Sequence, residues 1–378
     1  MTGDVRVVED GLEENALQRS PQGPSWLWLV TGLLVGVGLT VVFVTAGSDD
    51  VEPAAEQVSF PDVDEPTQVG EEGPGVTSVE PLGVGERVPG FPDTLVAVTQ
   101  LAGGNLGHLT WPVAGSPIEE ALPGFSTSFV EFDSSGRMLA QGAGLPGSDR
   151  VLMSFGTPHQ IRAMAADVTG FAWHDTEPGE LAYSQVVESE WRLNIVDLSR
   201  EPIAVTRGVG ISGGVAAWGE WGFAIQGPED VTLLSPEGEI VRPISGTLLG
   251  SAGDGRLAVY SGGEVQLVEP DGTAASLTVD LSLVGEVETA RFSPDGSKLA
   301  VVGGGGHLII PLTDSEEPIF APVTSGFPQM RWSSDSRFLV SPWIRGVLFI
   351  DTERRAQPVA ELTRHTVIAV AAVPLTER

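Results

Sequence analysis

Residues Arg291 to Val301 read Arg-Phe-Ser-Pro-Asp-Gly-Ser-Lys-Leu-Ala-Val, and their pattern indicates how the C-terminal part of the chain folds. It contains the end of one strand at an aromatic residue, a turn of Ser, Pro, Asp and Gly, and the start of an apolar strand. Asp-Gly readily adopts the positive φ angles that a tight hairpin requires. The stretch therefore predicts two antiparallel strands joined by a short turn.

The same unit recurs through the C-terminal part of the chain. A close copy runs from Arg331 to Val340 and places Asp335 forty residues after Asp295. Weaker copies begin at Glu131, Ala172, Ala217 and Ser251. After each turn come a third strand with alternating apolar residues and a poorer fourth strand. Four strands in about 40 residues form one β-propeller blade. The 283 residues from 96 to 378 therefore predict an all-β fold of about seven blades.

The two ends of this region predict how the propeller closes. Thr366 to Pro374 resembles a first strand with nothing after it, whereas Asp93 to Gln100 resembles a second strand with no first strand before it. An open ring would expose the edges of its sheets. We therefore expect the C-terminal strand to complete the N-terminal blade.

The stretch from Phe292 to Val301 resembles the WD-repeat-like propellers of the TolB type, whose unit has a Ser-Pro-Asp-Gly turn followed by a Leu-Ala strand. This resemblance implies a propeller that serves as a protein-binding platform or as an accessory domain of an enzyme, without indicating an activity. The chain departs from true WD repeats, because Val196-Asp197 and Ile350-Asp351 stand where Trp-Asp is expected and no Gly-His partner is present. We therefore do not expect Asp197 and Asp351 to have a structural hydrogen-bond role.

The N-terminal part predicts a membrane anchor. Residues 27–46 carry no charge, and a helix of this length spans about 30 Å of bilayer hydrocarbon. Arg6 and Arg19 precede it, which favours an N-terminus inside and a propeller outside the cytoplasm. The predicted parts are a cytosolic tail (1–25), a transmembrane helix (26–46), a disordered acidic and proline-rich linker (47–94) and the propeller (95–378). The alternative for the apolar segment is a cleaved secretory signal.

Small residues recur on one face of the predicted helix, at Gly32, Gly36 and Thr40. This four-residue spacing lets two membrane helices approach closely. It predicts a helix-dimer face for a homodimer. The alternative is a structural subunit that docks a larger membrane complex through this face.

Composition excludes several functions. The chain has no cysteine, so a disulfide framework, thiolate metal sites and cysteine nucleophiles are absent. Its net charge of −31 disfavours binding to nucleic acid. The five histidines are scattered without metal-ligand spacing, so we expect no metal site and no cofactor. A single lysine beside abundant arginine, glycine and alanine suggests a GC-rich bacterial genome.

One motif resembles a catalytic one. Residues 210–214 read Gly-Ile-Ser-Gly-Gly and fit the Gly-x-Ser-x-Gly nucleophile pattern. That motif requires a strand-to-helix turn in an α/β domain, whereas Ser212 falls in a connection between predicted blades. We therefore assign no catalytic residue.

Aromatic and arginine side chains outside the repeat pattern predict a binding rim. Exposed Trp and Arg are favoured anchors of protein interfaces. The predicted rim residues, placed in or beside loops between second and third strands, are Trp191, Arg192, Trp343, Arg345, His307 and Arg150. They predict a noncatalytic module that binds a protein, a peptide or an envelope ligand. The alternative is an extracytoplasmic hydrolase or lyase that uses acidic residues at the propeller channel, with a divalent metal bound by oxygen ligands.

Overall fold

The computed structural model describes residues 79–82, 86–101, 106–122, 129–142, 151–156, 160–165, 168–198, 205–208, 213–313, 316–322, 329–343 and 345–375. All of them belong to one compact unit, Val69–Arg378. Among them no helix has the length and hydropathy of a membrane span. The predicted cytosolic tail, the membrane helix and its Gly32, Gly36 and Thr40 face lie outside the described residues.

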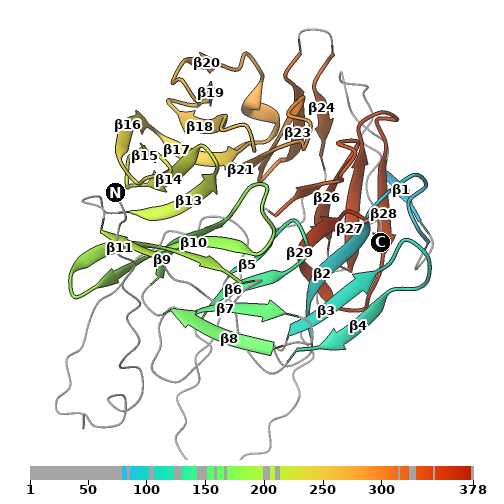
Figure 1. The fold of residues 1–378 in the computed structure, drawn as a ribbon. Helices are drawn as coiled ribbons and strands as arrows, with labels where there is room; N and C mark the ends of the chain where they lie inside the picture. Colours follow the sequence, from blue (N-terminus) through green and yellow to red (C-terminus); the bar gives the residue numbers. More distant parts are fainter. Residues whose placement is uncertain are drawn as a thin grey trace, which may run out of the picture. The chain divides into compact units, whose positions relative to one another are not determined.

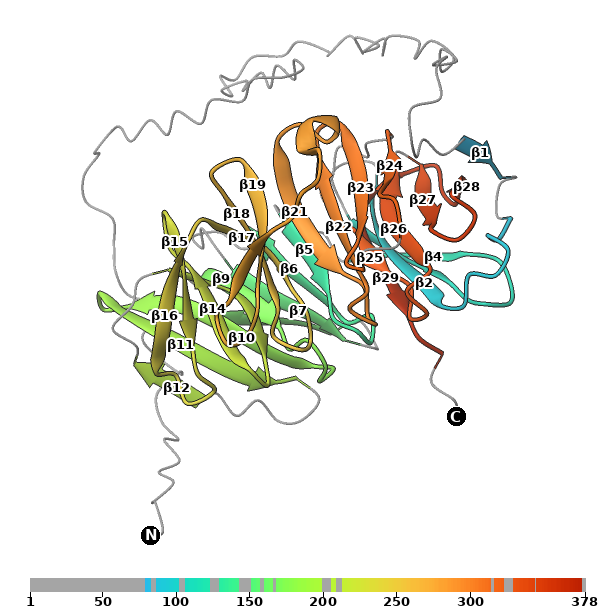
Figure 2. The same cartoon turned by 90° about the horizontal axis from the view of Figure 1, so that it is seen from above.

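The described strands form seven sheets, six of four strands and one of five (Figures 1 and 2). In chain order the first sheets contain β5 (Phe129–Phe132), β6 (Met138–Gly142), β7 (Val151–Gly156) and β8 (Gln160–Ala165), then β9 (Val168–Trp173), β10 (Glu180–Val187), β11 (Glu190–Asp197) and β12 (Val205–Gly208). The next two contain β13 (Gly214–Gly219), β14 (Gly222–Gln226), β15 (Asp230–Leu234) and β16 (Ile240–Ser245), then β17 (Thr247–Ser251), β18 (Leu257–Ser261), β19 (Glu264–Val268) and β20 (Ala274–Ser276).

The short 3-10 helix η2 (Leu281–Leu283) precedes β21, which begins the first of the remaining sheets. They contain β21 (Val287–Phe292), β22 (Lys298–Gly303), β23 (Gly306–Pro311) and β24 (Ile319–Ala321), then β25 (Arg331–Trp332), β26 (Phe338–Trp343), β27 (Gly346–Asp351), β28 (Gln357–Glu361) and β1 (Val79–Pro81). The last sheet joins the C-terminal strand β29 (Thr366–Val373) to β2 (Thr94–Gln100), β3 (Leu106–Trp111) and β4 (Ile118–Ala121).

The first strands of the sheets lie next to one another around a common centre. β9 contacts β13, β17 contacts β21, and β29 contacts both β25 and β5. β13 also contacts β17, and β21 contacts β25. The backbone N–H of Gly179 links the sheets of β5 and β9, because it donates to Oδ2 of Asp133 at 3.0 Å. β9 and β13 come especially close at Gly170, where a Cβ atom would stand 2.6 Å from the Cα atom of Gly214. Only glycine fits this crossing.

The predicted closure by the C-terminal strand is confirmed. β29 is antiparallel to β2 over its whole length, with Thr94 opposite Val373 and Gln100 opposite Thr366. Ala97, Val367 and Val370 on these strands are buried. The two ends of the repeat region therefore share one sheet, and no inner edge is left open there.

Some residues before the expected boundary at residue 95 also pack against the propeller sheets. β1 pairs in parallel with β28 as a fifth strand, and Val88 and Phe91 are buried in the core next to β26 and β27. Arg87 donates to the carbonyls of Pro112, Phe91 and Asp93. Composition does not reveal these contacts, because the apolar residues stand singly among prolines, glycines and acids.

The recurrent turn has the chemistry that its sequence predicts. Gly296 has a φ of +67° and Ser336, at the equivalent place, has a φ of +60°. The Ser293 hydroxyl donates to Oδ1 of Asp295 at 2.6 Å and accepts from the backbone N–H of Lys298 at 2.9 Å. Ser333 and Asp335 repeat the arrangement. The side chains thus hold the chain reversal that starts each second strand.

The aromatic residues at the ends of the first strands fill the space between sheets, as the repeat pattern predicts. They are all at least nine-tenths buried: Phe132, Trp173, Trp218, Phe292 and Trp332. Each such side chain buries about 150 to 250 Å². These contacts fix the spacing of neighbouring sheets.

Asp351 corrects one expectation, because it does have a structural hydrogen-bond role. Its carboxylate accepts from Nε of Arg337 at 3.0 Å and from Nη2 at 2.6 Å. It also accepts from the backbone N–H groups of Glu353 and Arg354 at 3.1 and 3.2 Å. Arg337, directly before the second strand of the same sheet, therefore fixes the end of the third strand through Asp351.

Candidate functional site

A pocket of about 870 Å³ lies at the centre of the first strands. Every sheet contributes to its wall, through residues such as Glu131, Phe171, Ala216, Leu248, Arg291, Arg331 and Ala372. This volume lies within the range of about 300 to 1,000 Å³ that is typical of small-molecule sites. The pocket is therefore the channel of the fold and its candidate functional site.

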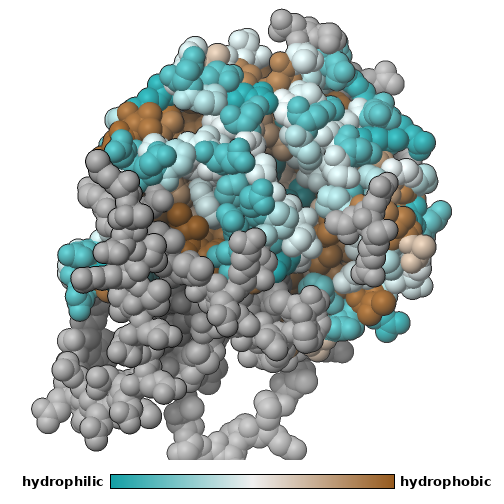
Figure 3. Space-filling model, viewed as in Figure 1, coloured by the Kyte–Doolittle hydropathy of each residue, from teal (hydrophilic) through white to brown (hydrophobic). Residues whose placement is uncertain are grey.

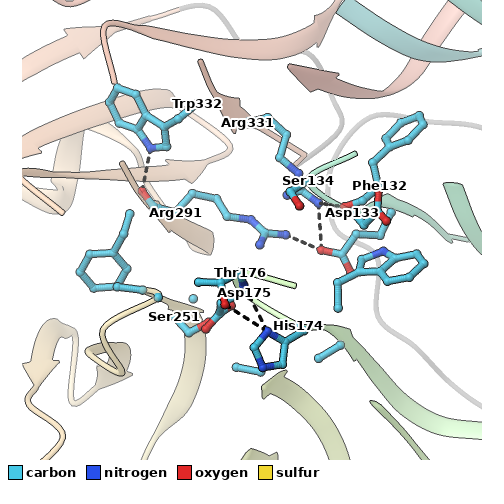
Figure 4. Close-up of a pocket in the computed structure, with 18 of the residues that line it drawn as sticks. Phe132, Asp133, Ser134, His174, Asp175, Thr176, Ser251, Arg291, Arg331 and Trp332 are labelled. Atoms are coloured by element: carbon cyan, nitrogen blue, oxygen red, sulfur yellow. Dashed lines mark hydrogen bonds and ion pairs between the residues drawn. The ribbon is translucent and has the colours of Figure 1, made fainter. Parts of the chain in front are cut away.

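The strand pattern explains which side chains reach the channel. Successive residues of a strand point to opposite sides, so the residue before each buried aromatic faces another direction. Glu131, Arg291 and Arg331 all occupy that position in their repeats. Figure 4 shows Arg291 extending into the pocket, with Arg331 and Asp133 on one side of it and His174 and Asp175 on another.

A charged cluster spans three sheets. Oε1 of Glu131 accepts a hydrogen bond from Nη2 of Arg291 at 2.6 Å and another from Nη2 of Arg331 at 3.0 Å. Burial acts to raise the pKa of Glu131, but the two guanidinium groups outweigh it and lower that pKa. Burial and the like charge of Arg291 lower the pKa of Arg331 to about 10. Glu131 and Arg331 are therefore both charged at neutral pH, and with the Arg291 guanidinium the cluster carries one net positive charge.

Asp175 lies on another part of the wall. It follows β9, and its carboxyl accepts from Nε1 of Trp221 at 3.1 Å and from the Ser251 hydroxyl at 3.3 Å. Burial raises the pKa of Asp175 to about 6, and these two hydrogen bonds only partly oppose that effect. Asp175 is thus a channel carboxyl that gains or loses its proton near neutral pH.

His174 is fixed next to Asp175. Its Nδ1 accepts from the backbone N–H of Glu177 at 3.0 Å and from that of Thr176 at 3.3 Å. The ring also stands edge-on to Trp218, with 4.6 Å between ring centroids. The neutral imidazole therefore carries its proton on Nε2.

Asp133 is the third carboxylate that lines the pocket, after Glu131 and Asp175, and it has a structural role. Its Oδ1 accepts from the backbone N–H groups of Ser135 and Arg137 at 2.9 and 2.7 Å, while Oδ2 accepts from Gly179 of the neighbouring sheet. Both oxygens are used to hold a turn and join two sheets. Among the described residues, no group of three or more His, Asp or Glu side chains is placed to hold a metal ion.

The predicted rim residues lie elsewhere. Trp191 is the second residue of β11, is buried in the core, and donates its Nε1–H to the carbonyl of Gly213. His307 in β23 is fully buried, with its Nε2 3.1 Å from the Ser341 hydroxyl. The expectation that these two side chains are exposed is therefore corrected. Their strand positions pack them against neighbouring sheets.

Other rim residues are closer to their expected places. Trp343 ends β26 and is half-buried, Arg345 is exposed in the following turn, and Arg192 is paired with Glu190 at 3.5 Å. Trp343 and Trp191 belong to different sheets that are not neighbours around the channel, so the structure does not bring them together. Second-to-third strand turns also lie at the opposite end of a sheet from the turns that line the channel. Arg150 and Ser212 lie outside the described residues.

Sequence reasoning did not predict the channel cluster, although its three residues begin copies of the repeat quoted above. The signal was a charge at one fixed position of the repeat, directly before the aromatic residue, in three copies and with both signs. An inward-facing position on an inner strand has no reason to be charged unless the charges meet one another or a ligand.

No protein-family model matches the chain, and no curated protein matches it significantly. Several solved structures share the fold. A functionally unknown protein from Desulfotomaculum acetoxidans is 11% identical with a TM-score of 0.51, and the match covers 75% of this chain and 99% of that one. A protein from Lactobacillus plantarum is 10% identical with a TM-score of 0.50, covering 74% and 98%. A provisional 6-phosphogluconolactonase from Bacteroides uniformis is 12% identical with a TM-score of 0.50, covering 75% and 100%.

These neighbours are propeller-like, and at such low identities their likeness establishes the fold alone. Together with the repeated four-stranded sheets, it defines the described part of the chain as a β-propeller. The channel pocket, and not the shared fold, must therefore carry the argument about function.

Proposed function

We propose that this protein is a noncatalytic binding module, a seven-bladed propeller that takes a ligand into its central channel. The observation that carries the proposal is a pocket of about 870 Å³ to which every sheet contributes, with a charged cluster on part of its wall. A site assembled from all sheets is rigid, and a rigid pocket binds a ligand without a large ordering cost.

The proposal places the propeller outside the cytoplasm, attached through the linker to a single membrane helix at residues 26–46. The uncharged segment and the arginines before it support this placement. The hydrophilic residues that predominate on the face shown in Figure 3 fit a domain that stands in water. Capture of a ligand would then occur within tens of ångströms of the bilayer.

Ala216 offers a direct test of channel binding. It is exposed, lies where β13 bulges in its pairing with β14, and lines the pocket. In Ala216→Trp a bulky ring fills the channel with little disturbance of the core. The matched control is Ala274→Trp, on the exposed outer strand β20.

The experiment uses full-length protein in lipid nanodiscs. It is incubated with a mixture of small organic acids, amides, sugars and short peptides, separated by gel filtration and analysed by mass spectrometry. For each compound that the wild type retains, we expect the amount bound to Ala216→Trp to be at least tenfold lower and the amount bound to Ala274→Trp to be unchanged. Equal retention by both variants would show that the channel is not the binding site.

Asp175 favours a second candidate, a hydrolase or lyase that uses a channel carboxyl as general base. Burial raises its pKa to about 6, in the range suited to proton transfer at neutral pH, and His174 lies beside it. The same compound mixture, extended with esters and lactones, would then yield products with the wild type and none with Asp175→Asn. Added EDTA tests the metal-dependent form of this candidate. Recovery of every compound unchanged would exclude it for these substrate classes.

A further inference from the structure

We propose that the channel ligand is an organic monocarboxylate with an apolar body, and that Arg291 binds its carboxylate group. This inference rests on the channel-binding function proposed above. It depends on how the two arginines of the cluster differ, on the net charge around them, and on the composition of the facing wall.

Arg291 has hydrogen-bond donors to spare. Its Nη2 donates to Glu131, while its Nε and Nη1 have no hydrogen-bond partner among the described residues. The side chain is 37% exposed and lines the pocket. Glu131 therefore holds the guanidinium in place and leaves free N–H groups directed at the cavity. A planar guanidinium with two free donors matches a carboxylate.

Arg331 is already committed to the protein. Its Nη1 donates to the carbonyl of Met330 at 3.2 Å, and its Nη2 donates to Glu131 at 3.0 Å and to the carbonyl of Phe132 at 3.2 Å. Its side chain is 19% exposed. Arg331 thus contributes positive potential and a fixed Glu131, and Arg291 is left to contact the ligand.

The net charge selects the anion. Two guanidinium groups and one carboxylate leave a single positive charge in the cluster. Asp175 is close enough for Arg291 to lower its pKa and for Glu131 to raise it, so any bound anion also lies near negative groups. A carboxylate carries one charge, whereas a phosphate monoester carries almost two at neutral pH and would be repelled more strongly.

Apolar side chains occupy the other side of the ring. Phe171 of β9 and Leu248 of β17 are half-buried, and Ala216 of β13 is exposed, all on the channel wall. These strands belong to three consecutive sheets, none of which carries Glu131, Arg291 or Arg331. His174 and Asp175 follow β9 on this side and also line the pocket. The channel therefore has the positive cluster on one side and apolar strand residues on the other, and a ligand that satisfies both has a carboxylate at one end and a hydrocarbon body at the other.

Two pairs of probes test the carboxylate and its source. Phenylacetate and phenylacetamide represent a small organic acid, and N-acetyl-Ala-Leu-Phe with a free or an amidated C-terminus represents the end of a peptide. Binding to full-length protein in nanodiscs is measured by isothermal titration calorimetry. We expect at least one acid to bind about tenfold or more tightly than its amide. The pair that shows this preference identifies the source.

Variants then assign the carboxylate to Arg291. Arg291→Gln should weaken the preferred acid about tenfold and remove its advantage over the amide, while Glu131 keeps Arg331 as a partner. Arg291→Lys should weaken the acid severalfold, because it keeps the positive charge but lacks the planar pair of donors. The control Arg355→Gln changes an exposed arginine whose side chain contacts Glu317 outside the pocket.

Thermal unfolding confirms that each variant is folded. An unchanged preference for the acid in Arg291→Gln, or equal binding of both acids and their amides, would overturn the inference. In the second case, binding to Ala216→Trp separates the two proposals. An amide that binds the wild type but not Ala216→Trp supports channel binding and rejects the preference for a carboxylate. Arg291→Lys keeps the test decisive if Arg291→Gln does not fold, because unchanged or stronger acid binding in it contradicts the inference.

Discussion

Nη2 of Arg291 lies 2.6 Å from Oε1 of Glu131, although 160 positions of sequence separate the two residues. They occupy the same position of the repeat in sheets that do not adjoin, and they meet because the first strands converge on one channel. Arg331 reaches the same oxygen at 3.0 Å. Residues at the same position of the repeat therefore contact one another across the channel.

Loss of Glu131 should reduce stability strongly. Glu131→Gln leaves Arg331 buried with a neutral partner and beside the like charge of Arg291, and breaking such a buried pair costs about 3 kcal/mol or more. Chemical unfolding of the full chain measures the change. The matched control is Glu190→Gln, whose pair with Arg192 is exposed and should be worth less than about 0.5 kcal/mol. Equal effects of the two substitutions would contradict a buried cluster.

A disulfide across the closing sheet should stabilise the domain. The chain has no cysteine, and Gln100 lies directly opposite Thr366 at the end of the β2 and β29 pair. The double variant Gln100→Cys/Thr366→Cys should therefore form one bond that encloses nearly the whole propeller. Closing so long a loop is expected to add about 3 to 5 kcal/mol to the free energy of unfolding. The same protein after reduction is its own control. Failure to oxidise would contradict the pairing.

Asp175 should make stability fall as pH rises from about 4 to about 6. Its pKa in the folded protein, about 6, exceeds its ordinary value of 3.8, so in this window the folded state binds more protons than the unfolded state. The stabilisation is complete below pH 4 and lost above pH 6. Relative to wild type, Asp175→Asn should therefore gain about 2 kcal/mol across this window. Melting temperatures at pH 4, 5, 6 and 7 measure it.

The comparison requires a matched carboxyl, because other acids titrate over the same range. Glu264→Gln changes an exposed residue at the start of β19 and should leave the pH profile of the wild type unaltered. If the melting temperatures of Asp175→Asn and wild type changed in parallel with pH, burial would not be raising the pKa of Asp175.

Much of the fold is predictable from the sequence because it depends on local chemistry that repeats. The Asp-Gly turn sets each hairpin, the alternation of apolar residues sets each strand, and the unpaired strands at the two ends require each other, as β2 and β29 show. The site is harder to predict, because it depends on which distant copies face one another. Glu131 and Arg331 have no local signal of contact, and only the ring geometry brings them together.

Individual side chains also depend on neighbours that the sequence does not name. Trp191 and His307 follow hairpin turns, where exposure is usual, yet each finds a hydrogen-bond partner in an adjoining segment, Gly213 for one and Ser341 for the other. β1 escapes prediction for a related reason, since a short strand added to an existing edge requires only backbone groups.

Asp351 provides the last prediction, which concerns the hydrogen-bond role that sequence reasoning did not expect. Asp351→Ala removes the two carboxylate oxygens that accept from Arg337 and the acceptor of the backbone N–H groups of Glu353 and Arg354. Uncoupling a largely buried charge in this way should cost about 3 kcal/mol. Glu353→Ala is the control, because Glu353 also contacts Arg337, at 3.2 Å, but its side chain is 67% exposed. That loss should stay below about 0.5 kcal/mol. Because burial of the carboxylate and not its charge alone sets the difference, equal losses from the two variants would contradict a structural role for Asp351.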